Sequence, residues 1–220
     1  MLRRRYDSEI MDDFSIQDSR IDDALDELKL VNRFLGGVST TRKGLSILRR
    51  AAAIQKPATV LDVGAGGCDV FGRIEALSVT AIDRNPRACA YIRDTTTFTV
   101  LCGDAESLPV ENKSFDIVHA SLFFHHFRRD RIIGMLKNFS SAAKYGIIIN
   151  DLRRSIWAYA GILFLTRIFS RSRMVRHDGP LSVLRGFSKS ELTGILDACG
   201  FERYSIRRTW AFRWLVVIFL

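Results

Sequence analysis

The chain has 220 residues, of which 47% are hydrophobic and 26% charged, and its formal net charge is +9. This length suits one well-buried α/β domain with a small cap and is too short for two full domains. No run of 18 apolar residues is present, and the first 15 residues lack the apolar core of a signal peptide, so we expect a cytoplasmic protein without a transmembrane span.

Residues 1–55 are predicted to form a helical extension. The first 17 residues are charged and weakly patterned, which predicts a loosely packed segment. A helix is predicted to begin near Asp18, on an Asp or Ser cap, and to continue to residue 35, because its apolar residues recur at helical spacing. Gly36 and Gly37 follow, and a second helix is predicted over about 40–53.

Residues 56–220 alternate between apolar strands and helical stretches, which predicts a parallel sheet with helices on both faces. Beyond residue 150, a long apolar helix is expected over about 154–171, then a loop with the sequence RMVRHDGPLSVLRGF, and a helix over 188–199. The last two strands should form an antiparallel hairpin. The predicted strands cover 59–63, 79–82, 97–101, 115–120, 145–150, 203–209 and 211–219.

A glycine-rich turn follows the first strand in TVLDVGAGGCDVFGRI (59–74), and TAIDRNP (80–86) comes next. This order predicts a strand, a turn, a helix and a second strand that ends at Asp83, which is the layout of a nucleotide-type cofactor site. Gly64 and Gly66 would let the backbone approach a ligand closely. Asp83 could accept both ribose hydroxyls of an adenosine, or it could simply cap the helix beside Asn85.

The charges in this turn favour one type of cofactor. A dinucleotide fingerprint would place glycine at position 69, but the chain has Asp69, and an acid there would repel a pyrophosphate. S-adenosylmethionine carries a sulfonium and an ammonium and no phosphate, so it is compatible with Asp62 and Asp69. Methyl transfer is therefore favoured over hydride transfer.

The segment CGDAESLPVENKSFDIVHAS (102–121) extends the cofactor site. Asp104 follows the third strand, where its carboxylate could accept a hydrogen bond from the exocyclic amine of adenine. Ala105 could supply a backbone N–H to a ring nitrogen. A Gly-Asp pair is a common turn, so this prediction depends on the whole string rather than on any one residue.

These motifs, together with FFHHF, resemble the class I S-adenosylmethionine-dependent methyltransferases over roughly 57–150, in the style of the ubiquinone/menaquinone-biosynthesis-like branch. VNRFLGG, NDLRRS, RHDGPLSVLRGF and LTGILDACGF are similar to a bacterial subgroup associated with type III polyketide synthases, whose members are thought to O-methylate phenolic or quinone-like lipids. One departure is Cys68, where the family's turn often has a third glycine. Cofactor contacts are expected from Asp62, Gly64, Ala65, Gly66, Asp69, Asp83, Arg84, Asp104, Ala105 and Ser121.

We therefore expect a doubly wound, seven-stranded, mostly parallel sheet in the order 3-2-1-4-5-7-6, with the last strand antiparallel. Residues 56–220 would form the methyltransferase domain, and an insertion at about 151–187 would shape the acceptor site. S-adenosylmethionine would be the cofactor. The acceptor would be small and lipophilic or aromatic, and most simply methylated at oxygen.

A phenolic acceptor benefits from a base, and histidine is the usual choice. His126 follows the fourth strand and could be that base or could cap the next helix. His177 could be the base with Asp178 orienting its imidazole, or it could order its loop. His119 lies within a predicted buried strand and is expected to be structural. Asp151, Arg154 and Arg185 are expected to bind the acceptor, with ion pairing as the alternative for Arg185.

The basic excess is concentrated in residues 128–176, where the net charge is +9. This pattern indicates either a solvated arginine-rich face or contact with an anionic membrane surface. The four cysteines show no metal-ligand spacing, so no metal is expected. The alternatives are C-methylation of a quinone precursor, an RNA-binding or RNA-modifying protein, and a cofactor-binding protein without catalysis. No nucleic-acid partner is expected, and either a monomer or a homodimer is compatible with the sequence.

Overall fold

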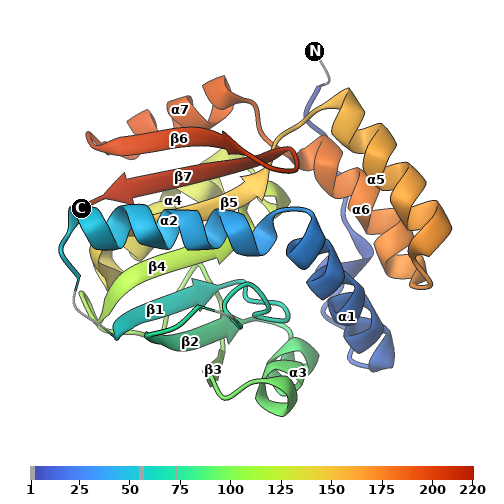
Figure 1. The fold of residues 1–220 in the computed structure, drawn as a ribbon, viewed down its shortest axis with the longest axis horizontal. Coiled ribbons are helices and arrows are strands. Elements are labelled where there is room, and N and C mark those ends of the chain that lie inside the picture. The colour runs from blue at the N-terminus through green and yellow to red at the C-terminus, as the bar shows by residue number, and fades with distance from the viewer. Residues whose placement is uncertain (1–2, 55–56, 73) are drawn as a thin grey trace.

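The strand order is β3-β2-β1-β4-β5-β7-β6 in a computed structural model that describes residues 3–54, 57–72 and 74–220 (Figure 1). Strands β1 to β5 pair in parallel, whereas β7 runs antiparallel to both β5 and β6. The predicted sheet order and terminal hairpin are confirmed. The strands are β1 (Ala58–Val63), β2 (Leu77–Asp83), β3 (Thr99–Cys102), β4 (Phe115–Ser121), β5 (Ala143–Leu152), β6 (Tyr204–Thr209) and β7 (Arg213–Phe219).

Helices cover both faces of this sheet, as the alternation of strands and helices predicts. Helix α2 (Gly37–Ala51) packs Leu45 and Leu48 on one face, against residues of β1, β5 and β7. Helices α4 (Arg129–Ala142) and α7 (Lys189–Ala198) cover the other face. Helix α3 (Pro86–Thr95) flanks β2 and β3. Helix α2 of the predicted extension therefore shares a hydrophobic core with the sheet.

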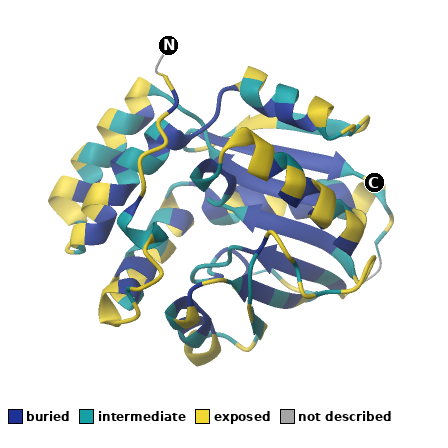
Figure 2. Cartoon of the chain, turned by 180° about the vertical axis from the view of Figure 1, so that it is seen from behind, coloured by how far each residue is buried: buried dark blue, intermediate teal, exposed yellow. Residues whose placement is uncertain are grey.

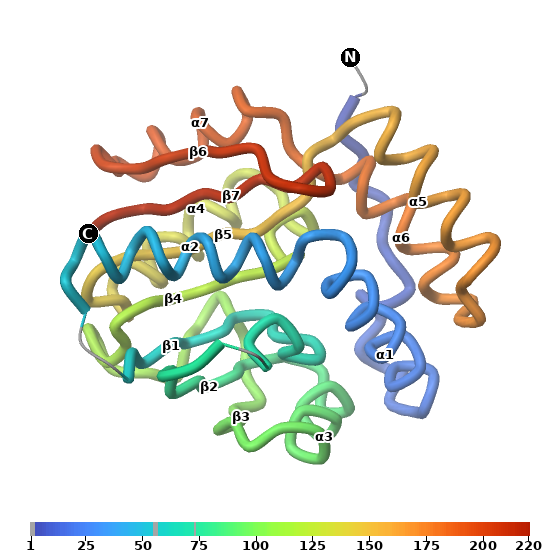
Figure 3. Tube along the Cα trace, viewed as in Figure 1, coloured from blue at the N-terminus to red at the C-terminus, as the bar shows by residue number. Residues whose placement is uncertain are grey.

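A cap of helices lies beyond the carboxyl ends of the parallel strands (Figures 1 and 3). It consists of α1 (Ser19–Phe34), α5 (Ile156–Phe169) and α6 (Arg173–Arg185), with a short 3-10 helix η1 (Ile10–Asp12) against α6. Helix α1, the other helix of the predicted extension, packs against α3 and α6. Asp18 caps α1 as predicted, because its side chain accepts a hydrogen bond from the Arg20 N–H. A second 3-10 helix, η2 (Phe124–His126), follows β4 and faces the cap.

The helix predicted between β1 and β2 does not form in the described part of that connection, which consists of turns and irregular backbone. Gly64, Gly66 and Cys68 all have positive φ angles, of 64°, 53° and 49°. An α-helix requires negative φ throughout, so the positive φ angles at every second residue prevent a helix from starting at the turn. Asp69 therefore does not lie at a helix N-terminus, and the electrostatics of this turn come from its side chains.

The loop predicted over 173–187 is wrong, because the chain forms helix α6 there. Ser172 caps the helix by accepting a hydrogen bond from the Val175 N–H. Helix α6 packs along α5, and Gly179 faces Ile162 and Thr166 of α5. Packing against α5 thus overrides the turn signal of the Gly179-Pro180 pair.

The loosely packed N-terminus predicted for residues 1–17 is also wrong for the part that the structure describes. Residues 3–17 run along α6 before α1 begins (Figure 3). Arg4 and Glu9 are buried, and the backbone N–H groups of Ile10 and Met11 donate to the Asp178 carboxylate at 2.8 and 3.0 Å. We call residues 3–17 the N-terminal strap.

Burial is uneven between the sheet and the cap (Figure 2). Strands β1, β4, β5 and β7 are buried over most of their length, whereas α5 exposes large apolar side chains, including Trp157 and Phe169 at 76% and 75%. Among the helices that the structure describes, none combines the length and the hydropathy needed to cross a membrane.

Candidate functional site

One cavity of about 690 Å³ lies between the carboxyl ends of the strands and the cap. Its size falls within the range of sites for small molecules and cofactors. All ten residues that the sequence predicts at the cofactor line it, at the end nearest β1 and β2. The other end extends between α1, α5, α6 and the turn from β6 to β7.

The glycine turn is held open by Asp83. One oxygen of this carboxylate accepts the Gly66 N–H at 2.8 Å, and the other accepts the Asn85 N–H at 2.8 Å. A Cβ on Gly64 would lie 2.0 Å from the Phe123 ring, so the turn also needs glycine for its own packing. Because a carboxylate oxygen accepts more than one hydrogen bond, Asp83 keeps acceptor capacity for a ligand in the cavity.

Asp62 is a buried anchor beneath this turn. It accepts a hydrogen bond from His119 Nδ1 at 2.7 Å and one from Cys68 Sγ at 3.4 Å. His119 Nε2 lies 3.0 Å from the Thr41 hydroxyl, and the imidazole is fully buried. The structure thus places His119 in the core, as the sequence predicts. Burial raises the pKa of the Cys68 thiol well above its usual value.

Asp69 is positioned by a chain of buried polar groups. Its carboxylate accepts hydrogen bonds from Asn32 Nδ2 at 3.0 and 3.3 Å, and Arg213 donates to the Asn32 oxygen at 2.9 Å. Burial raises the pKa of Asp69 to about 6, and the charge of Asp62 adds to this shift, whereas the hydrogen bond from Asn32 opposes it. The two acids give this part of the cavity a negative potential that a cationic ligand would balance.

The other end of the cofactor half is formed by Asp104, Ala105, Arg84 and Ser121. Asp104 accepts the Glu106 N–H at 2.9 Å and lies 3.6 Å from the Arg84 guanidinium. The Ser121 hydroxyl is buried and has no hydrogen-bond partner among the described residues. This orphaned polar atom indicates that a ligand completes the site. The donors, acceptors and charges here fit S-adenosylmethionine.

The predicted catalytic residues are separated by the structure. His177 lies on the exposed side of α6, outside the cavity lining, with its Nδ1 atom 2.7 Å from Asp178. Asp178 lines the cavity, but its carboxylate holds the N-terminal strap. His126 lines the cavity, and its Nδ1 atom bonds to Asp12 at 2.7 Å. Of the two predicted bases, only His126 faces the site.

The predicted acceptor-binding residues also differ from expectation. Asp151 and Arg154 do not line the cavity. Asp151 is buried against His125, and Arg154 bonds to Glu191 and to the Gly186 carbonyl. Arg185 does reach the cavity, but its guanidinium donates to Asp12, to backbone carbonyls of η2 and to the carbonyl of the strap residue Asp7.

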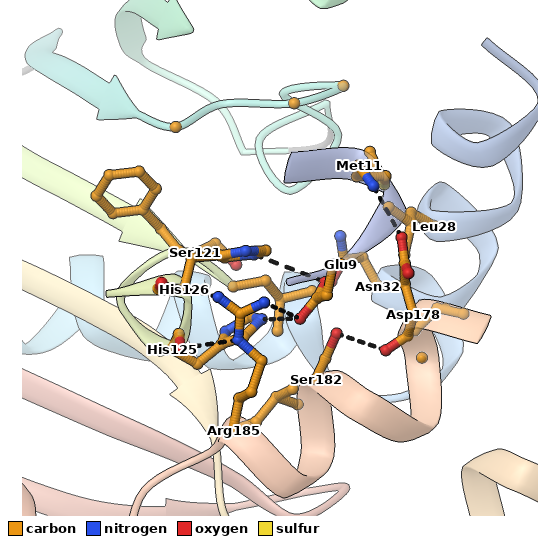
Figure 4. Close-up of a pocket in the computed structure, with 18 of the residues that line it drawn as sticks. Glu9, Met11, Leu28, Asn32, Ser121, His125, His126, Asp178, Ser182 and Arg185 are labelled. Carbon is orange, nitrogen blue, oxygen red and sulfur yellow. Dashed lines mark hydrogen bonds and ion pairs between the residues drawn. The ribbon is translucent and has the colours of Figure 1, made fainter. Parts of the chain in front are cut away.

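Sequence reasoning missed Glu9, Asp12 and the role of His125. Figure 4 shows Glu9 between His125, His126 and Arg185. Burial disfavours a charged His125, but Asp151 and Glu9 outweigh burial and raise the pKa of His125 to about 9. The adjacent pair His125-His126 was the one available signal, since no local pattern connects residue 9 to residue 125.

The far half of the cavity is apolar. Side chains of α1, α5 and the β6–β7 turn form its walls, and its polar groups are concentrated at the Glu9 cluster and on α6. Apolar lining residues of this half include Leu28, Val31, Leu35, Trp157, Ile162, Leu165, Val175, Val183, Trp210 and Phe212.

Residues 60–146 match the family described as methyltransferase domain. This segment contains all ten predicted cofactor residues and none of the cap. No curated protein matches the chain.

Solved structures share the fold at low sequence identity. The plantazolicin methyltransferase BpumL, in complex with a triazolic desmethylPZN analogue and SAH, is 16% identical, with a TM-score of 0.70 over 94% of this chain and 92% of that one. The related BamL complex is 19% identical, with a TM-score of 0.64 over 87% and 72%. A SAM-dependent methyltransferase from Aquifex aeolicus is 18% identical, with a TM-score of 0.58 over 79% and 88%. Both plantazolicin methyltransferase structures contain SAH, which agrees with the cofactor that the sequence predicts for this chain.

Proposed function

We propose that this chain, which is an S-adenosylmethionine-dependent methyltransferase, methylates a hydroxyl of a small lipophilic acceptor. The observation that carries the proposal is the division of one cavity into two halves. The half next to β1 and β2 is acidic and polar, and the half inside the cap is apolar. A phenolic or quinone-like lipid, as in the polyketide-associated subgroup that the sequence resembles, fits the second half.

The cofactor half would hold S-adenosylmethionine through residues already positioned by the fold. Asp83 would accept the ribose hydroxyls, Asp104 and Ala105 would meet the adenine, and Asp69 would face the cationic amino-acid end. Ser121 would satisfy its unpaired hydroxyl there. When bound, the cofactor supplies a methyl group on a positively charged sulfur, which requires only an aligned nucleophile from the acceptor.

We expect cofactor affinity to fall as the pH is lowered through about 6. Below that pH, Asp69 loses the charge that would face the cationic end of the cofactor, since its pKa is raised to about 6. Kd should rise by up to about tenfold per pH unit, because binding favours the ionised form. The effect on folding has the opposite sign: an acid with a raised pKa stabilises the folded chain at low pH, and this contribution is lost as the pH rises through about 6.

Calorimetric titration with S-adenosylhomocysteine between pH 5 and 7.5 measures this dependence. The isosteric variant Asp69→Asn should bind more weakly at pH 7.5, and its Kd should change little across the range. A wild-type profile as flat as that of the variant would contradict the assignment of Asp69.

The acceptor hydroxyl would lie where the two halves meet, beside the cluster of Glu9, His125 and His126. Of the two predicted bases, His126 lines the cavity, so it would be the one that lies next to the acceptor oxygen. The strap would close this region over the acceptor, since Asp178 fastens it through two backbone N–H groups. The apolar walls would exclude water from the reacting atoms.

Methyl-labelled S-adenosylmethionine tests the acceptor class directly. The enzyme is incubated with long-chain resorcinols, pyrones and hydroxyquinones, and separately with total RNA. The proposal predicts label in an O-methyl product of a lipophilic acceptor, identified by mass spectrometry. Label on ring carbon would establish C-methylation instead, and label in RNA alone would overturn the small-molecule acceptor.

A larger side chain in the apolar half of the cavity should impair binding of the acceptor and leave binding of the cofactor unchanged. Gly161 on α5 lines the cavity, and a Cβ there would meet no atom within 4 Å. Gly161→Leu should therefore fold and should lower kcat/KM for the acceptor by about tenfold, or about 1.4 kcal/mol. The matched control is Gly134→Leu on α4, also an open helix glycine but outside the cavity lining. Equal kinetics in the two variants would remove α5 from the acceptor site.

Contact with an anionic membrane surface is part of the same proposal. The exposed apolar residues of α5 lie in a segment that also carries exposed arginines at 167, 171, 173 and 176. An apolar surface bordered by basic groups suits the headgroup region of a bilayer, from which a lipid acceptor would enter. Flotation with vesicles of anionic lipid tests this contact, and an absence of binding at low salt would exclude it.

A further inference from the structure

Three side chains in the cavity point potential metal-ligand atoms, which no hydrogen bond occupies, toward one another. A carboxylate oxygen of Glu9, and one nitrogen each from His125 and His126, lie within 4.8 Å of one another. Glu9 comes from the N-terminal strap, and the two histidines come from η2 (Figure 4). Each atom is of a type that binds divalent transition metals.

Each of the two imidazoles is oriented by a carboxylate that bonds to its Nδ1 atom. His125 Nδ1 bonds to Asp151 at 2.8 Å, and His126 Nδ1 bonds to Asp12 at 2.7 Å. Both Nε2 atoms are therefore left to face Glu9. A carboxylate behind each histidine is the arrangement that fixes the ring and the tautomer of metal-binding histidines. His177 is also bonded to a carboxylate, but no second ligand faces its other nitrogen among the described residues.

The spacing of the free atoms is too long for hydrogen bonds. His125 Nε2 lies 3.6 Å from Glu9 Oε1, and His126 Nε2 lies 3.9 Å from Glu9 Oε2. Both Glu9 Oε1 and His125 Nε2 are buried without a hydrogen-bond partner. Two ligand atoms on one tetrahedral zinc ion are roughly 3.3 Å apart, because each lies about 2.0 to 2.1 Å from the metal. A single bound ion would satisfy both orphaned atoms.

The local charge also favours a cation. Glu9, Asp12 and Asp151 surround the imidazoles, and Arg185 contacts the carboxylates of Glu9 and Asp12. With both imidazoles deprotonated, as binding of a metal ion requires, this leaves two negative charges. Arg185 does not satisfy Glu9, since its nearest nitrogen is 3.4 Å from Glu9 Oε1 and already donates to Asp12 at 2.8 Å.

We propose that Glu9, His125 and His126 form a binding site for a divalent first-row transition metal ion, with its remaining coordination positions open to the cavity. The sequence predicted no metal, because its cysteines lack ligand spacing and residue 9 is far from residue 125. The role of the metal rests on the proposed function: as a Lewis acid it would bind the acceptor hydroxyl oxygen, and the hydroxyl proton would be released to solvent water, so that with metal bound His126 would act as a ligand and not as the base.

Metal binding can be measured without any acceptor. The full chain, free of affinity tag, is stripped with a chelator and titrated with Co²⁺, whose visible absorption reports ligation by nitrogen and oxygen. One ion per chain is expected, displaced by Zn²⁺. Glu9→Gln and His126→Gln should each weaken binding by at least a hundredfold, and Asp12→Asn by about ten- to hundredfold through the orientation of His126.

The matched control is His177→Gln, which removes an imidazole bonded to a carboxylate in the same way but outside the cavity. It should bind Co²⁺ like the wild type. Retained binding of S-adenosylhomocysteine shows that each variant is folded. Absence of stoichiometric Co²⁺ and Zn²⁺ binding by the wild type, or equal loss in His177→Gln, would overturn the site. Failure to methylate a lipophilic acceptor while the metal still binds would count against the proposed function alone.

Discussion

Asp83→Asn should weaken binding of S-adenosylmethionine by about a hundredfold or more. Both oxygens of this carboxylate accept backbone N–H groups, from Gly66 and Asn85. An amide has only one acceptor oxygen, so in either orientation its NH₂ group would face a backbone donor. The variant would also lose an acceptor for the ribose. The variant thus loses one charge-assisted hydrogen bond to the backbone and one to the ribose. Together they correspond to about 3 kcal/mol or more, which is about a hundredfold in Kd.

The measurement is calorimetric titration with S-adenosylhomocysteine, together with thermal unfolding of the unliganded variant. The matched control is Asp94→Asn, an exposed acid on α3 outside the cavity lining. That control should bind like the wild type. If Asp83→Asn bound within threefold of the wild type, neither the turn nor the ribose contact would depend on this carboxylate.

Arg213→Met should lower the free energy of unfolding by about 4 kcal/mol. Arg213 is buried at the start of β7 and donates to the Leu35 carbonyl and to the side-chain oxygens of Asn150 and Asn32. Burial lowers its pKa to about 10, so it remains charged at neutral pH. Methionine would remove a donor from three acceptors, and the buried oxygens of Asn150 and Asn32 would lose it at about 1 to 3 kcal/mol each, whereas the Leu35 carbonyl also accepts the Ala211 N–H.

Urea unfolding measures this loss, with Arg207→Met on the exposed face of β6 as the control. The control should change stability by less than about 0.5 kcal/mol. A loss below 1 kcal/mol in Arg213→Met would show that the three acceptors find other donors. Because Asn32 also holds Asp69, the destabilised variant should bind the cofactor more weakly than Arg207→Met does.

The cofactor half of the site could be predicted from the sequence because it is encoded in one continuous segment. Gly64 follows β1 directly, Asp83 is the last residue of β2, and Asp104 lies two residues after β3. The carboxyl ends of such parallel strands meet at one edge of the sheet. Their order along the chain therefore gives their order in space. The sheet order follows from the same regular alternation of strands and helices.

The acceptor half could not be predicted because tertiary packing determines it. Glu9 meets His125 across more than half the chain, and nothing near residue 9 indicates this contact. The Gly179-Pro180 pair is a turn signal that contact with α5 overrides, so α6 was expected as a loop. The placement of His177 outside the cavity follows from that helix, since helical geometry turns His177 and Val183 to different sides.

The N-terminal strap has a consequence for how the enzyme folds. Its anchors are the bonds from Ile10 to Asp178 and from Arg4 to the Arg185 carbonyl, which join residues 168 and 181 positions apart. Such contacts carry a high loop-closure entropy, so they form late and open early. The sheet and the glycine turn need neither anchor. Cofactor affinity should therefore depend little on whether the strap is docked, whereas acceptor affinity should depend on the docking equilibrium of this one short segment.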